Sequence, residues 1–384
     1  MVGMAMTMKP IDDLAAALDD AYPELAKVRA KEARGAGKGA VYLVGGAVRD
    51  LLLGRGRADI DLVVIGDAAE LAAGLGADPV EHERFATAKV KLDGHEIDIA
   101  TARTERYEAP GALPDVEPAT CIEDDLSRRD FTINSMALPL AGDGGLIDPH
   151  DGLADLEAGL LRVLHSGSFQ DDPTRALRAA RYAARFGFTL EPETEGLLRK
   201  ADLKTVSLDR RDAELRRLAA EPRAPQGFAL LAEWGLIEPR SGGVQLAQEV
   251  AALLTSPPWR DFVAPPPAIL AAALGPVGGE EDLARLSPAS PSAAVEAASG
   301  RNPVELVLAR VLGAEWLDRY LIEWRSVSLE IDGADLIEAG IAEGPAVGRG
   351  LDEALRQKLD GAVEGREQEL RVAVLAAGES DGVA

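Results

Sequence analysis

The sequence predicts an α+β fold, in which a mixed β-sheet near the N-terminus is followed by a long helical remainder. Residues 41–65 have the pattern of a strand, a glycine turn, a short helix, a glycine stop and a second strand. Residues 89–100 have the pattern of a β-hairpin that turns at Asp93 and Gly94. Residues 190–384 have mostly helical spacing, interrupted by clusters of Pro, Gly and Ser.

The composition is typical of a soluble globular protein with more than one domain. The chain has 384 residues, of which 47% are hydrophobic and 28% are charged, so it can bury two or more cores. Its net charge of −24 argues against a general nucleic-acid binder. The single cysteine, Cys121, excludes an intramolecular disulfide and fits the cytoplasm. The least interrupted apolar stretch, residues 262–279, contains prolines and glycines, so we predict no membrane helix.

Helical spacing also occurs in two segments that flank the first strand pair. Residues 11–34 have this spacing and are followed by the Gly-rich residues 35–39, which predict a linker. Residues 67–75 have it as well, directly after the second strand. The order of elements is therefore helix, linker, strand, helix, strand, helix and hairpin.

A glycine turn and two carboxylates form the first candidate site. Gly45 and Gly46 allow a sharp turn and a close approach to a ligand, and Arg49 adds positive charge for a polyphosphate. Asp59 and Asp61 are two residues apart on a strand and share one face, where they can hold one or two Mg²⁺ ions. A βαβ fragment with a polar strand end is the alternative. The combined order and spacing favour phosphoryl or nucleotidyl transfer.

The hairpin and the segment after it provide further candidates. Glu96 and Asp98 share one face of the second hairpin strand. Asp98 is our candidate for a third catalytic carboxylate, and a solvated strand face is an equally good interpretation. Residues 101–120 contain several prolines and lack a secondary-structure pattern, which predicts a long loop of the functional or disordered kind.

Two cationic stretches follow the predicted loop. Arg128 and Arg129 directly precede Asp130 and Asn134, a mixture that suits phosphate and ribose binding, although a charged helix surface has the same pattern. Asp171, Asp172 and Pro173 suit the start of a helix that ends at Gly187. One side of that helix carries Arg175, Arg178, Arg181 and Arg185. This basic side is the charge concentration that a nucleic-acid partner requires in an acidic protein, and a solvated face with Asp–Arg pairs is the alternative.

Taken together, these motifs resemble those of the class II tRNA nucleotidyltransferase and bacterial poly(A) polymerase family, of the polymerase-β superfamily. The similarity is greatest to the CCA-adding enzymes. The matching stretches are residues 45–50 with 59–61, 128–134, 148–156, 171–178 and 210–215. Residues 331–366 also resemble the family's C-terminal segment, so the likeness spans nearly the whole chain.

The resemblance implies a polymerase-β-like nucleotidyltransferase head with a mixed β-sheet, followed by an all-α neck, body and tail in a seahorse shape. The implied domains are an N-terminal extension and linker at 1–37, a catalytic head at 38–150, a neck that recognises the base at 151–225, a body at 226–325 and a tRNA-binding tail at 326–384.

The resemblance also implies template-independent addition and repair of the 3′-terminal CCA of tRNA from CTP and ATP, with release of pyrophosphate. The tRNA 3′-hydroxyl attacks the α-phosphorus in line, and two Mg²⁺ ions stabilise the attacking and leaving oxygens. Addition of A only, or poly(A) polymerase activity, is the first alternative. A non-catalytic RNA-binding relative is the second, and the intact Asp59 and Asp61 pair argues against it. Residues 101–120 correspond to the family's flexible loop, which argues against an enzyme that adds only CC.

Family roles transfer to matching positions in this chain. The metal carboxylates are Asp59 and Asp61; the triphosphate and sugar are held by Gly45, Gly46, Arg49, Arg128, Arg129, Asp130 and Asn134; and the base is read by Asp172 and Arg175 with support from Arg178 and Arg181. Cytosine and adenine both present an amino donor beside a ring-nitrogen acceptor, which a carboxylate and a guanidinium match, whereas uracil and guanine present the opposite order. The chain departs from the family in having Asp171 where Glu is usual and Ser135 where Ala is common.

Overall fold

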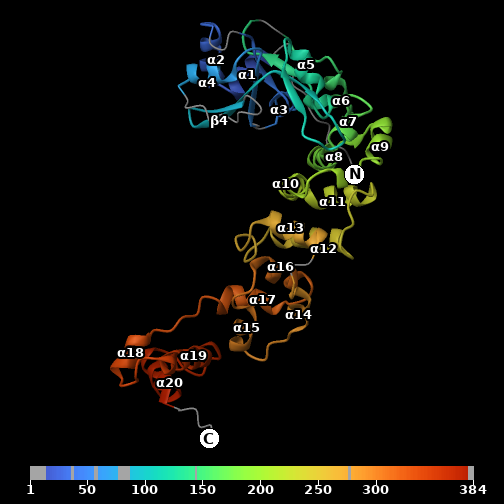
Figure 1. Ribbon diagram of the computed structural model, residues 1–384. Coiled ribbons are helices and arrows are strands. Elements are labelled where there is room, and N and C mark those ends of the chain that lie inside the picture. Colours follow the sequence, from blue (N-terminus) through green and yellow to red (C-terminus); the bar gives the residue numbers. More distant parts are fainter. Residues whose placement is uncertain are drawn as a thin grey trace. The chain divides into compact units, whose positions relative to one another are not determined.

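The computed structural model describes residues 14–35, 39–55, 59–76, 87–142, 145–275 and 278–378. The chain forms two compact units, Met1–Ile237 and Glu238–Ala384, coloured blue to yellow-green and yellow to red in Figure 1. Within the described residues, the strands all lie in the first unit, and the second unit is helical. The α+β fold class is therefore confirmed, whereas the finer domain boundaries stay predictions.

The N-terminal segment forms two helices, not one. They are α1 (Leu14–Ala21) and α2 (Leu25–Glu32). The helical spacing of residues 11–34 is interrupted because Pro23 lacks a backbone N–H and cannot continue a helix. Residues 11–13 and 36–38 of the predicted helix and linker lie outside the described residues.

A five-stranded mixed sheet forms the core of the first unit, in the order β3-β4-β2-β1-β7. Its strands are β1 (Val41–Val44), β2 (Ile60–Val64), β3 (Thr87–Leu92), β4 (His95–Thr101) and β7 (Ala137–Pro139). The helix α3 (Gly46–Leu52) connects β1 and β2, and α4 (Ala68–Gly74) follows β2. β2 pairs parallel with β4 and antiparallel with β1, and this register places Asp61 opposite Asp98. The predicted turn at Asp93 and Gly94 is confirmed, with both residues at positive φ.

The prediction that residues 101–120 form a loop without secondary structure is wrong. β5 (Arg103–Arg106) and β6 (Asp115–Pro118) pair antiparallel and leave residues 107–114 as their connection. We call residues 103–118 the polar hairpin. Charged residues occupy five of the eight strand positions, so the strands lack the regular apolar alternation by which a strand is recognised in a sequence.

Short helices and a long α8 complete the first unit. Their bounds are α5 (Ile122–Ser127), the 3₁₀-helix η2 (Thr132–Asn134), α6 (Gly152–Ala158), α7 (Ser168–Asp171), α8 (Thr174–Phe186), α9 (Pro192–Leu198), the 3₁₀-helix η3 (Leu203–Thr205), α10 (Leu208–Ala219) and α11 (Ala224–Glu233), with the strands β8 (Leu160–Leu161) and β9 (Thr189–Leu190) pairing parallel. The alanine face of α8 packs against α10 and α11, and Gly187 ends α8 in the left-handed conformation, as predicted. The opposite side of α8 carries its arginines.

The second unit is built from α12 to α20. The bounds are α12 (Gly243–Leu253), α13 (Pro265–Leu274), α14 (Glu280–Arg285), α15 (Pro291–Ala298), α16 (Pro303–Val311), α17 (Trp316–Arg319), the π-helix η4 (Tyr320–Trp324), α18 (Gly333–Glu338), α19 (Pro345–Leu359) and α20 (Arg366–Gly378). The last three helices enclose a small apolar core around Leu336 and Ala354. In the described part of the chain, no helix combines the length and apolarity needed to cross a membrane.

Candidate active site

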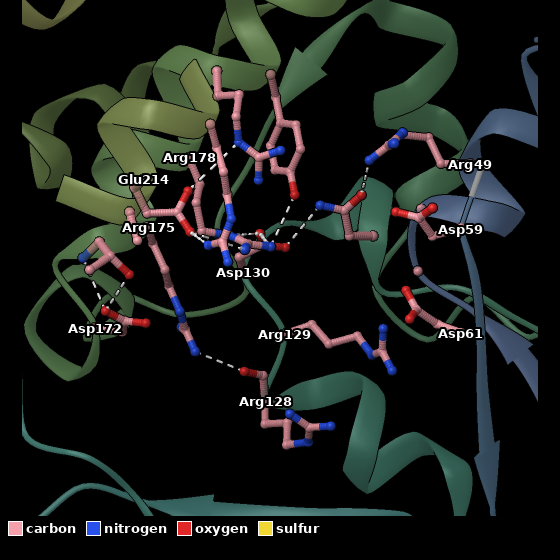
Figure 2. Close-up of a pocket in the computed structure, with 18 of the residues that line it drawn as sticks. Arg49, Asp59, Asp61, Arg128, Arg129, Asp130, Asp172, Arg175, Arg178 and Glu214 are labelled. Carbon is pink, nitrogen blue, oxygen red and sulfur yellow. Dashed lines mark hydrogen bonds and ion pairs between the residues drawn. The ribbon is translucent and has the colours of Figure 1, made fainter. Parts of the chain in front are cut away.

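The first unit contains a cavity of about 1110 Å³ between the sheet and the helices α8 and α10. Figure 2 shows its carboxylates and arginines converging from these elements. All of the predicted site residues line this cavity except Asp98. The lining also includes residues that were not predicted to belong to the site, namely Asp50, Arg103, Glu105, Tyr107, Thr174, Tyr182, Arg185, Arg210, Ala213, Glu214 and Arg217.

Asp59 and Asp61 lie at one end of the cavity, at the start of β2. Burial raises the pKa of Asp61; the charge of Arg129 opposes this shift, and the charges of Asp98 and Asp59 add to it. A carboxylate that is buried beside other carboxylates is stabilised by a cation. In the described residues no three His, Cys, Asp or Glu side chains form a metal site by themselves. Two carboxylates with open space beside them suit Mg²⁺, which keeps positions for water and phosphate oxygens.

Asp98 is near Asp61 in the sheet, but its side chain is engaged elsewhere. It is about half exposed and forms an ion pair with Lys89, with 2.9 Å between Nζ and Oδ1. It lines a second cavity of about 320 Å³, which shares Asp61, Arg103, Arg128 and Arg129 with the first. Its role as the third carboxylate therefore stays a prediction.

Gly45 is required by the geometry of the turn. Its φ is +66°, and a Cβ atom there would lie 2.8 Å from Nη1 of Arg129. Glycine therefore allows Arg129 to extend across the turn toward Asp61. The buried Nε atom of Arg129 has no hydrogen-bond partner among the described residues, and the residue lines the cavity.

A chain of hydrogen bonds runs from α3 to α8 and holds the two sides of the cavity together (Figure 2). The buried Arg49 donates to Oδ1 of Asn134 at 2.5 Å, and Asn134 donates to Asp130 at 2.9 Å. Arg178 donates from Nε to the other oxygen of Asp130 at 2.7 Å. Burial alone would raise the pKa of Asp130, but the charge of Arg178 and the bond from Asn134 outweigh it and lower that pKa far below its usual range.

We expect Asp130→Asn to destabilise the protein by about 2 kcal/mol at pH 7, because it leaves Arg178 without its carboxylate partner. This figure is below that of a fully buried pair because Arg178 is 32% exposed. The folded-state pKa of Asp130 is depressed, so its stabilisation is present above about pH 4 and is lost as the pH falls. Urea unfolding of both proteins should therefore show a difference that shrinks between pH 5 and 3. Asp124→Asn, at an exposed position, is the control, and a difference that is independent of pH would contradict the assignment.

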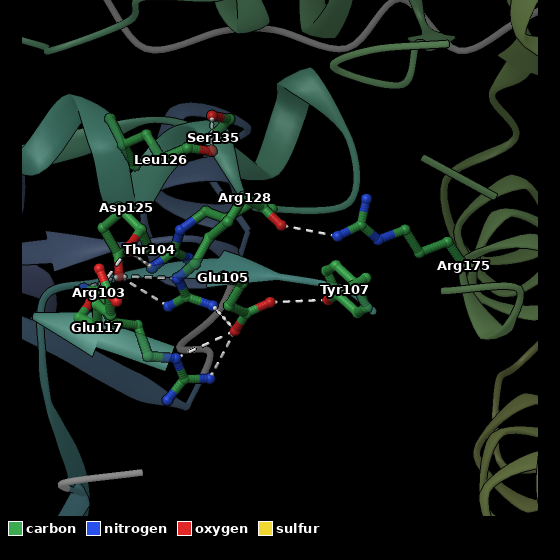
Figure 3. Close-up of polar contacts among 11 residues, drawn as sticks. Arg103, Thr104, Glu105, Tyr107, Glu117, Asp125, Leu126, Arg128, Ser135 and Arg175 are labelled. Atoms are coloured by element: carbon green, nitrogen blue, oxygen red, sulfur yellow. Dashed lines mark hydrogen bonds and ion pairs between the residues drawn. The ribbon is translucent and has the colours of Figure 1, made fainter. Parts of the chain in front are cut away.

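Asp125, which the sequence analysis missed, positions both arginines of the adjacent motif, and Figure 3 shows its contact with Arg128. Its carboxylate is fully buried and accepts from Nη2 of Arg128 at 2.7 Å and from Nη2 of Arg129 at 2.9 Å. Burial would raise its pKa, but the charges of Arg129 and Arg128 outweigh this effect and lower it. The spacing of three and four residues on a helix was the signal for these pairs.

The polar hairpin is tied to the same cluster through Glu105 (Figure 3). Its carboxylate accepts from Arg128 at 2.8 Å and from Arg103 at 3.0 Å, and its other oxygen accepts from the hydroxyl of Tyr107 at 2.8 Å. Glu105 and Asp125 thus both accept hydrogen bonds from Arg128, so the guanidinium of Arg128 joins the polar hairpin to α5. Arg129, with one carboxylate partner, is the freer of the two cations.

Asp172 and Arg175 lie at the start of α8, at the opposite end of the cavity from Asp59. Arg175 is buried and donates to Oγ of Ser168 at 2.6 Å and to the carbonyl of Arg128 at 2.8 Å. These two bonds use two of its five N–H groups, and within the described residues the other three have no hydrogen-bond acceptor. The predicted one-sided row of arginines is confirmed, since Arg175, Arg178, Arg181 and Arg185 all line the cavity.

Several known proteins are similar to this chain. Residues 41–162 match the family model described as the poly A polymerase head domain. A CC-adding tRNA nucleotidyltransferase of Deinococcus radiodurans is 37% identical over 349 residues, which are 85% of this chain and 87% of that protein. An A-adding tRNA nucleotidyltransferase of Aquifex aeolicus is 42% identical over 219 residues, and the chain spans only 26% of its length.

Solved structures show the same fold over nearly the whole chain. A CCA-adding enzyme in complex with ATP has a TM-score of 0.78 and 29% identity, covering 97% of this chain and 98% of that one. The CCA-adding enzyme of Thermotoga maritima in complex with tRNA has a TM-score of 0.74 and 28% identity, covering 96% of this chain and 99% of that one. The similarity thus includes the helical second unit as well as the head.

Proposed function

Because the chain belongs to the class II tRNA nucleotidyltransferase and poly(A) polymerase family, we propose that it adds and repairs the 3′-terminal CCA of tRNA in the cytoplasm. Its substrates are CTP, ATP and tRNA, and pyrophosphate is released. The observation that carries this proposal is that one cavity contains both the predicted metal carboxylates and the predicted base-reading pair. Asp59 and Asp61 lie at one end, Asp172 and Arg175 lie at the other, and arginines line the space between them. Its volume and its two chemically different ends suit a nucleoside triphosphate.

At the carboxylate end, the residues bind the triphosphate and direct the attack. Asp59 and Asp61 hold Mg²⁺, which offsets the negative charge of the reacting phosphates when it is bound. Arg129 and the backbone at Gly46 bind the triphosphate. The 3′-hydroxyl oxygen of tRNA forms a bond to the α-phosphorus and its proton passes to solvent, while the bond from the α-phosphorus to the oxygen that bridges to the β-phosphate breaks and pyrophosphate leaves. Arg49 keeps the turn at Gly45 in place through Asn134.

At the other end, Asp172 and Arg175 select the base. The carboxylate accepts from the amino group of cytosine or adenine, and the guanidinium donates to the adjacent ring nitrogen. Uracil and guanine leave the buried Arg175 and the partly buried Asp172 without partners, which costs roughly 1–3 kcal/mol for each group that is left unpaired. Arg178 and Arg181 support this end from the same side of α8.

Addition of CC only is one alternative. It is supported by the similarity to the CC-adding enzyme of Deinococcus radiodurans, which extends over 85% of this chain. The polar hairpin argues against it, since it occupies the position of the family's flexible loop and is held to the site through Glu105. Addition of A only is the other alternative, supported by the similarity to the Aquifex enzyme.

One assay separates these activities. We expect the protein, with Mg²⁺ and tRNA lacking all three terminal nucleotides, to incorporate labelled CTP, and then ATP when both are present. Products would be resolved by length on denaturing gels. Growth by two C residues without A would favour the CC-adding alternative, and no incorporation of C would contradict the main proposal. Transfer RNA ending in CC, supplied with ATP alone, is the matched substrate for A addition.

A further inference from the structure

The two carboxylate oxygens of Asp172 have different surroundings. Oδ1 accepts from the backbone N–H of Thr174 at 3.0 Å, from the hydroxyl of Thr174 at 2.7 Å and from Nη2 of Arg210 at 2.9 Å. In the part of the chain that the structure describes, Oδ2 has no hydrogen-bond partner, and Asp172 lines the cavity. The three donors therefore fix the orientation of the carboxylate and leave Oδ2 as the acceptor that a base can reach.

Arg210 connects this carboxylate to the polar hairpin. Its Nη1 donates to the carbonyl oxygen of Gly111 at 3.0 Å, so one planar guanidinium holds Asp172 on one nitrogen and the hairpin connection on the other. The residues joined in this way are far apart in the sequence, on α10, at the start of α8 and in the connection 107–114. A shift of the hairpin tip would thus be transmitted to the carboxylate through a rigid group.

The hairpin tip contacts α7, η3 and α10 at a residue that has to be glycine. The backbone N–H of Gly111 donates to the carbonyl of Gln170 at 3.2 Å, so both backbone groups of Gly111 are bonded here. Its φ is +73°, and a Cβ atom would lie 2.7 Å from the carbonyl oxygen of Thr205. This close seating cannot accept a side chain without movement of the tip.

We propose that Arg210 is a positioning residue for nucleotide selection, which orients the base-reading carboxylate of Asp172 and makes that orientation depend on the seating of the hairpin tip at Gly111. This inference rests on the proposed function. Asp172 and Arg175 make the contacts with the base, and Arg210 acts only through Asp172. A merely structural Arg210 would change stability while leaving the preference for C and A intact.

The first test compares Arg210→Ala and Arg210→Lys with the wild type. The measured quantity is kcat/KM for CTP and ATP divided by kcat/KM for UTP and GTP, on tRNA substrates of defined 3′ end. We expect Arg210→Ala to lower this ratio about tenfold, because a charge-assisted hydrogen bond to the reading carboxylate is lost. Arg210→Lys should recover part of the ratio, since it restores the charge without the fork. Arg216→Ala, at an exposed position of the same helix, removes the same charge and should leave the ratio unchanged.

The second test disturbs the tip without altering Asp172 or α10. Gly111→Ala should also lower the ratio, and the double variant with Arg210→Ala should lose less than the product of the two single effects, because both act through one link. Thermal unfolding identifies variants that fail to fold. A ratio that survives in folded Arg210→Ala, or independent effects in the double variant, would overturn the inference. A wild type that adds no nucleotide would instead overturn the proposed function.

Discussion

Replacing Asp59 and Asp61 with alanine is expected to abolish nucleotide transfer, with a loss of about a thousandfold or more, while tRNA still binds. The two carboxylates lie together at one end of the cavity, and burial together with the nearby charges of Asp98 and Asp59 raises the pKa of Asp61, so a bound cation would stabilise its charged form. A bound metal ion contributes several kcal/mol of transition-state stabilisation in such reactions. Incorporation of labelled nucleotide would measure transfer, and fluorescence anisotropy of labelled tRNA would measure binding.

Two single variants on β4 sharpen this experiment. Asp98→Ala removes the carboxylate that lies opposite Asp61 in the sheet register, and Glu96→Ala removes an exposed one two residues away on the same strand. If Asp98 is the third catalytic carboxylate, its variant loses most of the activity and the Glu96 variant keeps it. Equal activity of both would assign Asp98 to its ion pair with Lys89. Unchanged turnover of the Asp59 and Asp61 double variant would refute the metal assignment itself.

The part of the site that the sequence predicted well is encoded by local patterns. The strand, turn and helix around Gly45 follow from apolar runs and glycines, and the shared face of Asp59 and Asp61 follows from the two-residue period of a strand. The arginine side of α8 follows from helical periodicity, because alanines occupy the packing side. In each case the neighbours that decide the structure are a few residues away.

The part that could not be predicted depends on tertiary proximity of polar groups. Glu123, Asp124 and Asp125 form one acidic run, and although helical spacing pairs Asp125 with both arginines, nothing local shows that its carboxylate is fully buried. The polar hairpin has no continuous apolar face that would mark its strands in the sequence. It is held to the site by the hydrogen bond from Arg128 to Glu105, two residues that are 23 positions apart. The pairing of Asp172 with Arg210 likewise joins polar residues that are far apart in the sequence, 38 positions in this case.

Removal of the Arg175 guanidinium has the second large effect that we expect. Arg175→Ala should lower discrimination against UTP and GTP roughly 10–100-fold, because the site loses the donor that distinguishes the ring nitrogen of C and A from the N–H of U and G. The residue is 4% exposed and lines the cavity beside Asp172, so water replaces the lost donor poorly. The measurement is kcat/KM for each of the four nucleoside triphosphates on tRNA lacking its terminal nucleotides.

The controls separate base reading from support of the cavity. Ser168→Ala removes the oxygen that accepts from Nη1 of Arg175 but keeps the guanidinium and its bond to the carbonyl of Arg128, so its selectivity should change little. Arg175→Lys keeps the charge without the planar fork and should remain poorly selective, since base recognition needs directed donors more than charge. Retained discrimination in a folded Arg175→Ala protein would mean that another donor, with Arg178 and Arg181 the nearest candidates along α8, reads the base.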